Sequence, residues 1–234
     1  MTNTSKIYWS YCHNIFQVRA NQPVSVITNY FKGKDIQEHG LEYVKCPAFK
    51  DYFNNTFGLQ SLFSYDLTFG DSVSSQQHDQ NFFEEMVNVR NEKSRLASFR
   101  LEYIFIAKDD NLEMEVLPSM LEANSFNSTA ILIPAVMDIG QYLRPIDCSF
   151  HCRKNTMDIK EQDIYSYVKF NTNKKIEFER FLWDDTIKQE ISNTIVGLKG
   201  YRNLNIKPLT WYYKKQQRLK TKERVIKLIK NNLL

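Results

Sequence analysis

Glycine is scarce in this 234-residue chain, with 7 residues, and proline is nearly as rare, with 6. The glycine-rich turns that hold phosphate groups, G-x-G-x-x-G and G-x-x-x-x-G-K-[S/T], are both absent from the sequence. Their absence argues against nucleotide-dependent chemistry. A G-x-S-x-G turn, which would expose a nucleophilic serine, is missing as well.

Long apolar runs and paired cysteines are also missing. No stretch approaches the roughly 20 apolar residues that a membrane-spanning helix requires, so we expect no transmembrane segment. Residues 1–17 lack a basic region followed by an apolar one, which predicts a protein that is not secreted. The four cysteines, Cys12, Cys46, Cys148 and Cys152, show no C-x-x-C spacing, and we interpret them as reduced, mostly structural thiols in a cytosolic setting.

Aromatic residues are abundant, with 16 Phe and 13 Tyr. Hydrophobic residues make up 42% and charged residues 25% of the chain, which is ordinary for a globular protein. Many aromatics with few glycines favour packed antiparallel sheet. The predicted fold class is α+β, a mostly antiparallel β-sheet or sandwich with C-terminal helices. We predict a sheet-based body over residues 1–200, followed by a linker and a basic C-terminal helix over residues 201–234.

Alternating apolar and charged residues predict two β-hairpins, each with one face on the core. The paired segments are residues 99–105 with 112–116, and residues 164–170 with 176–179. Three apolar runs predict further strands over residues 24–31, 131–133 and 146–152. A helix is expected to begin at Asp184 or Asp185, either of which can cap its first turn.

Cys148, His151 and Cys152 have the residue types of a zinc site but not its geometry. On a strand, the two cysteines share a face roughly 13 Å apart, and His151 points to the opposite face. They therefore do not share one metal ion. Cys12 and His13 are neighbours in sequence, which does not place a base against a thiol. We predict no catalytic residue, no metal site and no cofactor.

Two carboxylate pairs leave an alternative open. Each pair, Glu113 with Glu115 and Glu177 with Glu179, shares one strand face. We interpret both as solvated faces with cross-strand ion pairs to Arg100 or Lys169. The alternative is a metal-dependent enzyme that processes nucleic acid, with these carboxylates as ligands.

Positive charge is concentrated at the C-terminus. Residues 207–234 contain nine basic residues and one acidic residue, Glu223, a net charge of +8. The whole chain carries +4, so the preceding residues sum to −4. A mildly acidic body with a strongly basic end predicts contact with an acidic partner, either nucleic acid or protein.

The predicted binding residues combine cations with aromatic rings that could stack on bases. They are Trp211, Tyr213, Lys214, Lys215, Arg218, Lys220, Lys222, Arg224, Lys227 and Lys230. An apolar stripe is expected beside them, formed by Tyr212, Leu219, Ile226, Ile229 and Leu233. One alternative is that this stripe packs on the body and leaves the lysines in water; another is a membrane-surface helix.

Two segments carry a resemblance to a known family. They are Lys45-Cys46-Pro47-Ala48-Phe49 through Asn55 and Phe57, and Met137-Asp138-Ile139-Gly140 through Arg144-Pro145 to Phe150. Together with the strand at residues 99–105 they resemble uncharacterised proteins of tailed marine bacteriophages. The resemblance implies a phage origin and a location in the host cytoplasm or the virion. It supplies no binding or catalytic residues.

The second of these segments also predicts a structural corner. Gly140 permits a turn conformation that other residues resist, and Pro145 holds Arg144 extended. We expect a buried pair between Asp138 and Arg144 to brace this corner, in an architectural role.

These observations lead to one hypothesis and two rivals. The hypothesis is a non-enzymatic phage protein, either a virion component or a host-directed binding module, whose basic C-terminal helix contacts nucleic acid or an acidic protein surface. One rival is the metal-dependent enzyme. The other is a homo-oligomeric structural piece, in which aromatic-rich strands assemble across subunits.

Overall fold

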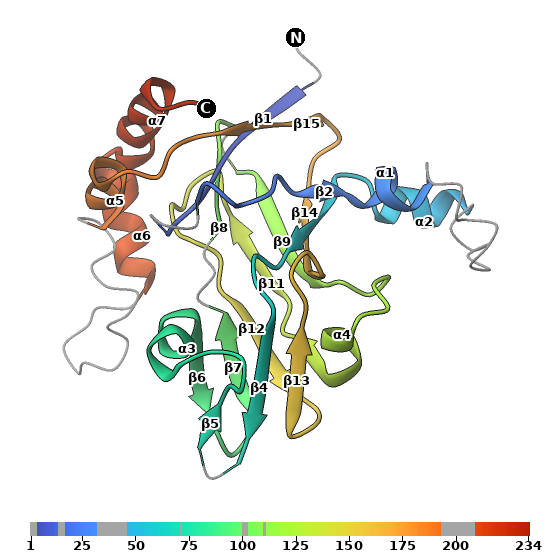
Figure 1. The fold of residues 1–234 in the computed structure, drawn as a ribbon. Helices are drawn as coiled ribbons and strands as arrows, with labels where there is room; N and C mark the ends of the chain where they lie inside the picture. The colour runs from blue at the N-terminus through green and yellow to red at the C-terminus, as the bar shows by residue number, and fades with distance from the viewer. Residues whose placement is uncertain are drawn as a thin grey trace.

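Four β-sheets and the short helices beside them form the fold in the computed structural model (Figure 1), which describes residues 4–13, 17–31, 46–70, 72–99, 103–109, 111–192 and 209–234. Most strand pairs are antiparallel, and the last helices lie at the C-terminus. The α+β class predicted from the sequence is confirmed.

Two of the sheets form the upper half of the molecule in Figure 1. The first, called the β1 sheet, consists of β15 (Lys175–Arg180), β1 (Thr4–Tyr11) and β8 (Tyr103–Ala107). The second, called the β14 sheet, consists of β11 (Ala135–Asp138), β9 (Glu113–Pro118), β14 (Ile164–Phe170), β3 (Thr56–Gln60) and β2 (Val24–Ser25). Their inner faces meet through phenylalanine rings, with Phe105 and Phe170 centred 5.8 Å apart and Phe57 and Phe178 4.8 Å apart.

The lower half repeats this arrangement with two smaller sheets. One consists of β13 (Thr156–Ile159), β4 (Tyr65–Phe69) and β5 (Val73–Ser74). The other consists of β10 (Ala130–Leu132), β12 (Cys148–Cys152), β7 (Leu96–Phe99) and β6 (Val87–Asn91), with α3 (Gln80–Met86) and α4 (Ser125–Thr129) beside them. The rings of Tyr65 and Phe99 meet across the sheets at 5.8 Å. One hydrophobic core runs through both halves.

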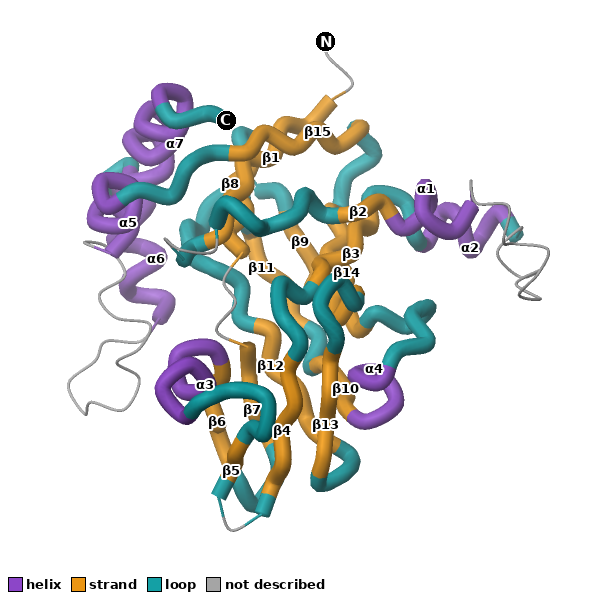
Figure 2. Tube along the Cα trace, viewed as in Figure 1, coloured by secondary structure: helices purple, strands orange, loops and turns teal. Residues whose placement is uncertain are grey.

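Helices cover both outer faces of the upper half (Figure 2). On one side α1 (Val26–Phe31) and α2 (Pro47–Tyr52) lie against the β14 sheet, and Val26 packs with Ile164 and Tyr167. On the other side, α5 (Asp185–Ser192), α6 (Leu209–Arg218) and α7 (Thr221–Asn231) lie beside the β1 sheet. Strands β1 and β8 therefore alternate between two apolar environments, one inside the sandwich and one under the helices.

The predicted hairpins were wrong in their pairing, although their strands exist. Strand β8 pairs with β1, whereas β9 pairs with β14 and β11. Likewise β14 pairs with β9 and β3, whereas β15 runs parallel to β1. In both cases the chain crosses from one sheet of the sandwich to the other at the turn. Alternation shows which residues face the core, but it does not identify the neighbouring strand.

The other predicted elements had mixed outcomes. The strands expected at residues 131–133 and 146–152 correspond to β10 and β12. The strand expected at residues 24–31 is confirmed only for β2, because the chain continues as helix α1. Asp184 caps α5 as expected, since its carboxylate accepts a hydrogen bond of 2.7 Å from the Ile187 N–H.

Candidate functional site

The basic C-terminal segment forms two helices rather than the single helix expected. Helix α6 ends at Arg218 and α7 begins at Thr221. Between them Lys220 adopts the left-handed conformation, with φ of 50°. This break changes the phase of the helical pattern, so residues on either side of it no longer share one stripe. The predicted linker at residues 201–208 lies outside the described residues.

Helix α7 docks on the body through side chains spaced four residues apart. Thr221, Val225 and Ile229 are all buried. Val225 and Ile229 join an apolar cluster with Ile187 of α5 and Ile104 of β8. This spacing places one face of the helix against the body and leaves the opposite face in solvent.

The predicted apolar stripe was wrong in two of its five members. Leu219 is 38% exposed and Leu233 is 44% exposed, whereas Ile229 is buried and Ile226 is half-buried. The side chain of Tyr212 lies outside the described residues. The predicted stripe assumed one continuous helix through position 220. Because the left-handed Lys220 separates two helices, the stripe does not follow the buried face on both sides of it.

The end of the chain is hydrogen-bonded to the segment after β15. The Leu182 N–H donates to the Asn232 carbonyl at 2.9 Å, and the Leu234 N–H donates to the Arg180 carbonyl at 3.0 Å. The Asn232 amide donates to the Asp184 carboxylate at 2.7 Å. Helix α7 is therefore held at its end as well as along its apolar face.

Helix α6 is anchored by Gln216, which is only 2% exposed. Its side-chain amide donates to the Leu143 carbonyl at 3.1 Å, and its side-chain oxygen accepts from the Leu143 N–H at 3.2 Å. Nearby, the ring of Tyr213 stacks on that of Tyr142, with centroids 4.2 Å apart. One polar side chain thus satisfies both backbone groups of a buried leucine.

The corner beneath α6 is built differently from the expectation. Asp138 and Arg144 do not form the predicted pair. The Asp138 carboxylate accepts hydrogen bonds from the backbone N–H groups of Gly140 and Gln141, both at 3.0 Å. Arg144 instead donates to the Tyr213 hydroxyl at 3.0 Å. The corner still has an architectural role, because it supports α6.

Close packing explains the glycine in this corner better than turn conformation does. A Cβ atom at Gly140 would lie 2.6 Å from the Asn111 nitrogen and 2.7 Å from the Asp109 oxygen. Real Cβ atoms do not approach backbone atoms so closely, so position 140 admits no side chain without a backbone shift.

Several predicted binding residues are engaged within the protein. Arg224 forms an ion pair of 2.5 Å with Glu190 and also donates to the Leu219 carbonyl at 2.6 Å. Lys222 donates to the Lys108 carbonyl at 3.2 Å. The Lys215 ammonium lies 5.6 Å from the ring centre of Trp211, within cation–π range. Tyr213 is occupied by its contacts with the corner.

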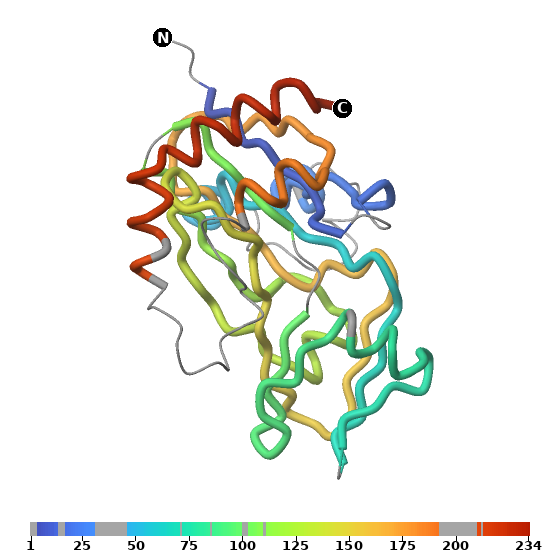
Figure 3. The backbone as a smooth tube through the Cα atoms, turned by 90° about the vertical axis from the view of Figure 1, so that its left-hand side faces the viewer, coloured from blue at the N-terminus to red at the C-terminus, as the bar shows by residue number. Residues whose placement is uncertain are grey.

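The remaining predicted cations are exposed. They are Lys214, Arg218, Lys220, Lys227 and Lys230. On α6, Lys214 and Arg218 share the side opposite Gln216 with Trp211, which is 43% exposed. On α7, Lys227 and Lys230 lie opposite the buried Val225. Figure 3 shows α6 and α7, in red, following one another along the outside of the fold.

This exposed set, called the outward basic face, consists of Trp211, Lys214, Arg218, Lys220, Lys227 and Lys230. Glu223 is exposed on the same side of α7, four residues before Lys227, and offsets part of the positive charge. The face therefore remains strongly basic, and burial of the opposite sides of the helices does not consume its charges.

The strand carboxylates do not come together. Glu113 and Glu115 lie on β9 in the β14 sheet, whereas Glu177 and Glu179 lie on β15 in the β1 sheet. Glu115 is opposite Lys169 in register, but the predicted ion pair between them is not formed. The Lys169 ammonium lies 4.4 Å from the centre of the Tyr52 ring, and Glu115 accepts a hydrogen bond from the Asn171 amide at 2.9 Å. Glu179 forms an ion pair with Lys6 instead. Arg100 is not among the described residues. In the part of the chain that the structure describes, no group of three His, Cys, Asp or Glu side chains could hold a metal ion.

The cysteines of β12 have the properties of core residues. Cys148 and Cys152 are fully buried, and burial raises the pKa of each thiol to about 12. A thiol with so high a pKa is protonated at neutral pH and is a poor nucleophile. His151 lies between them in the strand and is only half-buried, consistent with the opposite orientation expected.

Comparisons with known proteins give no assignment: no protein-family model matches the chain, and no curated protein matches it. Among the described residues, no helix is long and apolar enough to cross a membrane. Sequence reasoning missed Gln216, because a glutamine within a basic helix gives no sign of burial. It also missed a polar cavity near α1, since the residues that line it are far apart in sequence.

Proposed function

We propose that this chain is a non-enzymatic bacteriophage protein, either a virion component or a host-directed binding module, that binds nucleic acid through its outward basic face. The phage origin rests on the sequence resemblance. The nucleic-acid interaction rests on one observation: α7 buries its apolar side and α6 is anchored through Gln216, while five cations on and between these helices remain exposed. Cations that are not used in packing are available to neutralise phosphates.

The composition of this face favours nucleic acid over an acidic protein surface. Its cations lie on two successive helices, which suits the regular spacing of phosphates along a strand. Trp211 is 43% exposed on the same side of α6 as Lys214 and Arg218, so a base that takes the place of the Lys215 ammonium could stack on the indole while the cations contact the backbone. An acidic protein surface has no requirement for such a stacking group.

Fluorescence anisotropy with short labelled oligonucleotides tests this proposal. Five phosphate contacts predict that log K falls with log salt with a slope of about −4, so affinity falls about 10²- to 10³-fold between roughly 50 and 200 mM salt. The variant Lys214→Gln, Arg218→Gln, Lys227→Gln, Lys230→Gln should lose most of this salt dependence. These side chains are exposed, so the fold should be unaffected.

A matched control removes the same number of exposed cations elsewhere, by Lys93→Gln, Arg153→Gln, Lys154→Gln and Lys160→Gln. These positions lie in the lower half of the molecule, around the turns that follow β6 and β12 and at the end of β13. Equal loss of binding in both variants would show attraction by net charge alone and would contradict the proposal. Equal or tighter binding to polyglutamate would indicate an acidic protein partner instead.

A second measurement distinguishes a virion component from a host-directed binding module. Mass spectrometry of purified phage particles should detect the chain in stoichiometric amounts if it belongs to the virion. Its presence only in infected cells would favour the host-directed module.

A further inference from the structure

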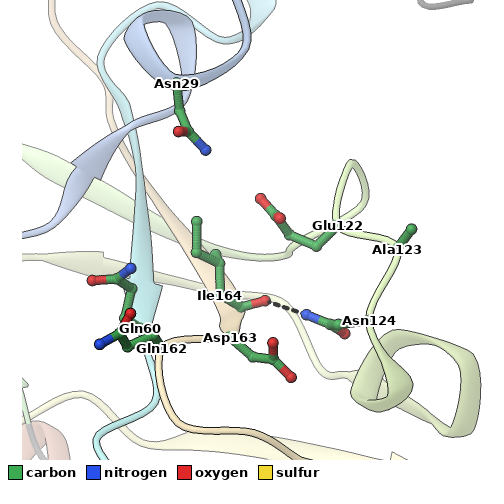
Figure 4. Close-up of a pocket in the computed structure, with 8 residues that line it drawn as sticks. All are labelled: Asn29, Gln60, Glu122, Ala123, Asn124, Gln162, Asp163 and Ile164. Atoms are coloured by element: carbon green, nitrogen blue, oxygen red, sulfur yellow. Dashed lines mark hydrogen bonds between the residues drawn. The ribbon is translucent and has the colours of Figure 1, made fainter. Parts of the chain in front are cut away.

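A polar cavity of about 330 Å³ opens beside α1, at the edge of the β14 sheet (Figure 4). Its lining comes from four regions that are far apart in sequence: α1, the end of β3, the loop before α4, and the turn between β13 and β14. The lining residues are Asn29, Gln60, Glu122, Ala123, Asn124, Gln162, Asp163 and Ile164. The volume is at the lower end of the range for small-molecule sites.

Hydrogen bonds within the protein fix the walls of this cavity. Asn124 caps α4 by accepting from the Asn127 N–H at 3.0 Å, and its amide donates to the Ile164 carbonyl at 2.9 Å. The turn is tied to Ser61, whose N–H donates to the Asp163 carbonyl at 2.9 Å and whose carbonyl accepts from the Gln162 N–H at 2.8 Å. The cavity is therefore preformed, which reduces the cost of ordering it around a ligand.

Several hydrogen-bonding groups that line this space are not used within the protein. Figure 4 shows the Asn29 amide and the Glu122 carboxylate directed into the opening from opposite walls. Within the described part of the chain, the side chains of Asn29, Gln60 and Gln162 form no hydrogen bond. Among the described residues, one oxygen of the Glu122 carboxylate is engaged, by the Tyr167 hydroxyl at 2.9 Å, and one of Asp163, by the Lys160 N–H at 2.9 Å.

The residues that line the cavity disfavour both an anion and a calcium ion as its ligand. No lysine or arginine lines the cavity, while two carboxylates do, which disfavours an anion. Calcium needs six to eight oxygen ligands, several of them carboxylate. Here each carboxylate has one oxygen already engaged, so neither offers the bidentate coordination typical of a calcium site, although the amide oxygens could also act as ligands.

Sugar hydroxyls match the remaining chemistry. Each hydroxyl both donates and accepts, so a sugar can donate to the free oxygen of Glu122 and accept from the Asn29 amide, which face each other across the opening. Gln60, Gln162 and Asp163 supply further polar groups around its rim. We propose that this cavity binds a neutral, hexose-sized sugar. The proposal is independent of the outward basic face.

Saturation-transfer NMR with free glucose, galactose, mannose and N-acetylglucosamine tests this assignment. At least one of them should give a saturable response with a dissociation constant of about 1 mM, as expected for a ligand of this size. Asn29→Ala and Gln162→Gly each remove an amide, and each should weaken binding by between about twofold and tenfold. Glycine is the suitable replacement at position 162, because Gln162 has φ of 71°.

The control variants Asn173→Ala and Gln189→Ala remove exposed amides outside the cavity and should leave the response unchanged. Thermal unfolding of every variant verifies that the fold is intact. The absence of a saturable response with all four sugars, or equal responses from cavity and control variants, would overturn the proposal. Calcium binding by calorimetry that is lost in Glu122→Gln would also overturn it, in favour of a cation site.

Discussion

The two outer faces of the upper sandwich are covered in similar ways but present different chemistry to solvent. Against the β1 sheet, α5 and α7 enclose an apolar cluster of ten buried residues. Against the β14 sheet, α1 and the segment after α2 enclose a cluster of four, so this second layer rests on a smaller contact. On the solvent side, the first layer carries the outward basic face, and the second borders a cavity lined by amides and carboxylates.

This difference shows how attachment and recognition are separated in the two layers. Apolar side chains attach each layer to its sheet, and burial of apolar surface is independent of charge. The exposed side of each layer can therefore differ without loss of the fold. If this separation holds, changes on the inner faces should alter stability strongly, and changes on the outer faces should alter binding with little effect on stability.

The largest expected effect comes from the inner face of α7. Ile229→Ala should lower the free energy of unfolding by about 2–5 kcal/mol, because Ile229 is fully buried and its removal leaves a cavity. Val26→Ala, under α1, should cost about 2 kcal/mol, and the matched change under α7, Val225→Ala, should cost more because Val225 lies in the larger cluster. Chemical denaturation of these variants measures the difference.

A larger loss in the free energy of unfolding for the α1 variant than for the α7 variants would contradict the comparison between the two helical layers. Lys227→Ala, on the opposite side of α7, is the control and should change stability by less than about 0.5 kcal/mol.

A smaller effect is expected at the anchor of α6. Gln216→Leu keeps a side chain of similar size but leaves the N–H and carbonyl of buried Leu143 without their partners. An unsatisfied buried group costs about 1–3 kcal/mol. We expect α6 to loosen, with faster amide hydrogen exchange along it, while α7 keeps its protection.

Lys214→Leu, at an exposed position of α6, is the control for this experiment. Unchanged exchange in Gln216→Leu would mean that α6 is held by other contacts, such as the stacking of Tyr213 on Tyr142.

The sequence predicted which segments form strands better than it predicted which strands pair. Alternation identified the segments that became β8, β9, β14 and β15, because side chains on a strand face alternate sides. It did not identify their partners, since alternation shows which side chains face the core and is the same whichever strand lies alongside. Val24–Phe31 shows a second limit: its β-branched residues favour strand, but the segment from Val26 is helical and packs on Ile164 and Tyr167.

The sequence predicted that positive charge is concentrated at the C-terminus, but it did not predict which of the basic side chains are exposed. The concentration of lysine and arginine after residue 207 could be counted directly. Their division into exposed and engaged groups depends on the left-handed Lys220 and on partners such as Glu190, which tertiary contacts alone reveal. The polar cavity could not be anticipated, because Asn29, Glu122 and Gln162 are brought together only by the folded sheets.

The smallest expected effect concerns the ion pair that joins α7 to α5. Arg224 and Glu190 are both partly exposed, so their interaction should be worth less than about 1 kcal/mol and should weaken as salt screens it. A double-mutant cycle with Arg224→Gln and Glu190→Gln, measured by denaturation at low and high NaCl, isolates this coupling. A coupling above about 2 kcal/mol that persists in salt would mean that charge helps to attach the helix. The basic residues of α7 would then serve stability as well as recognition, and the separation between its inner and outer faces would fail.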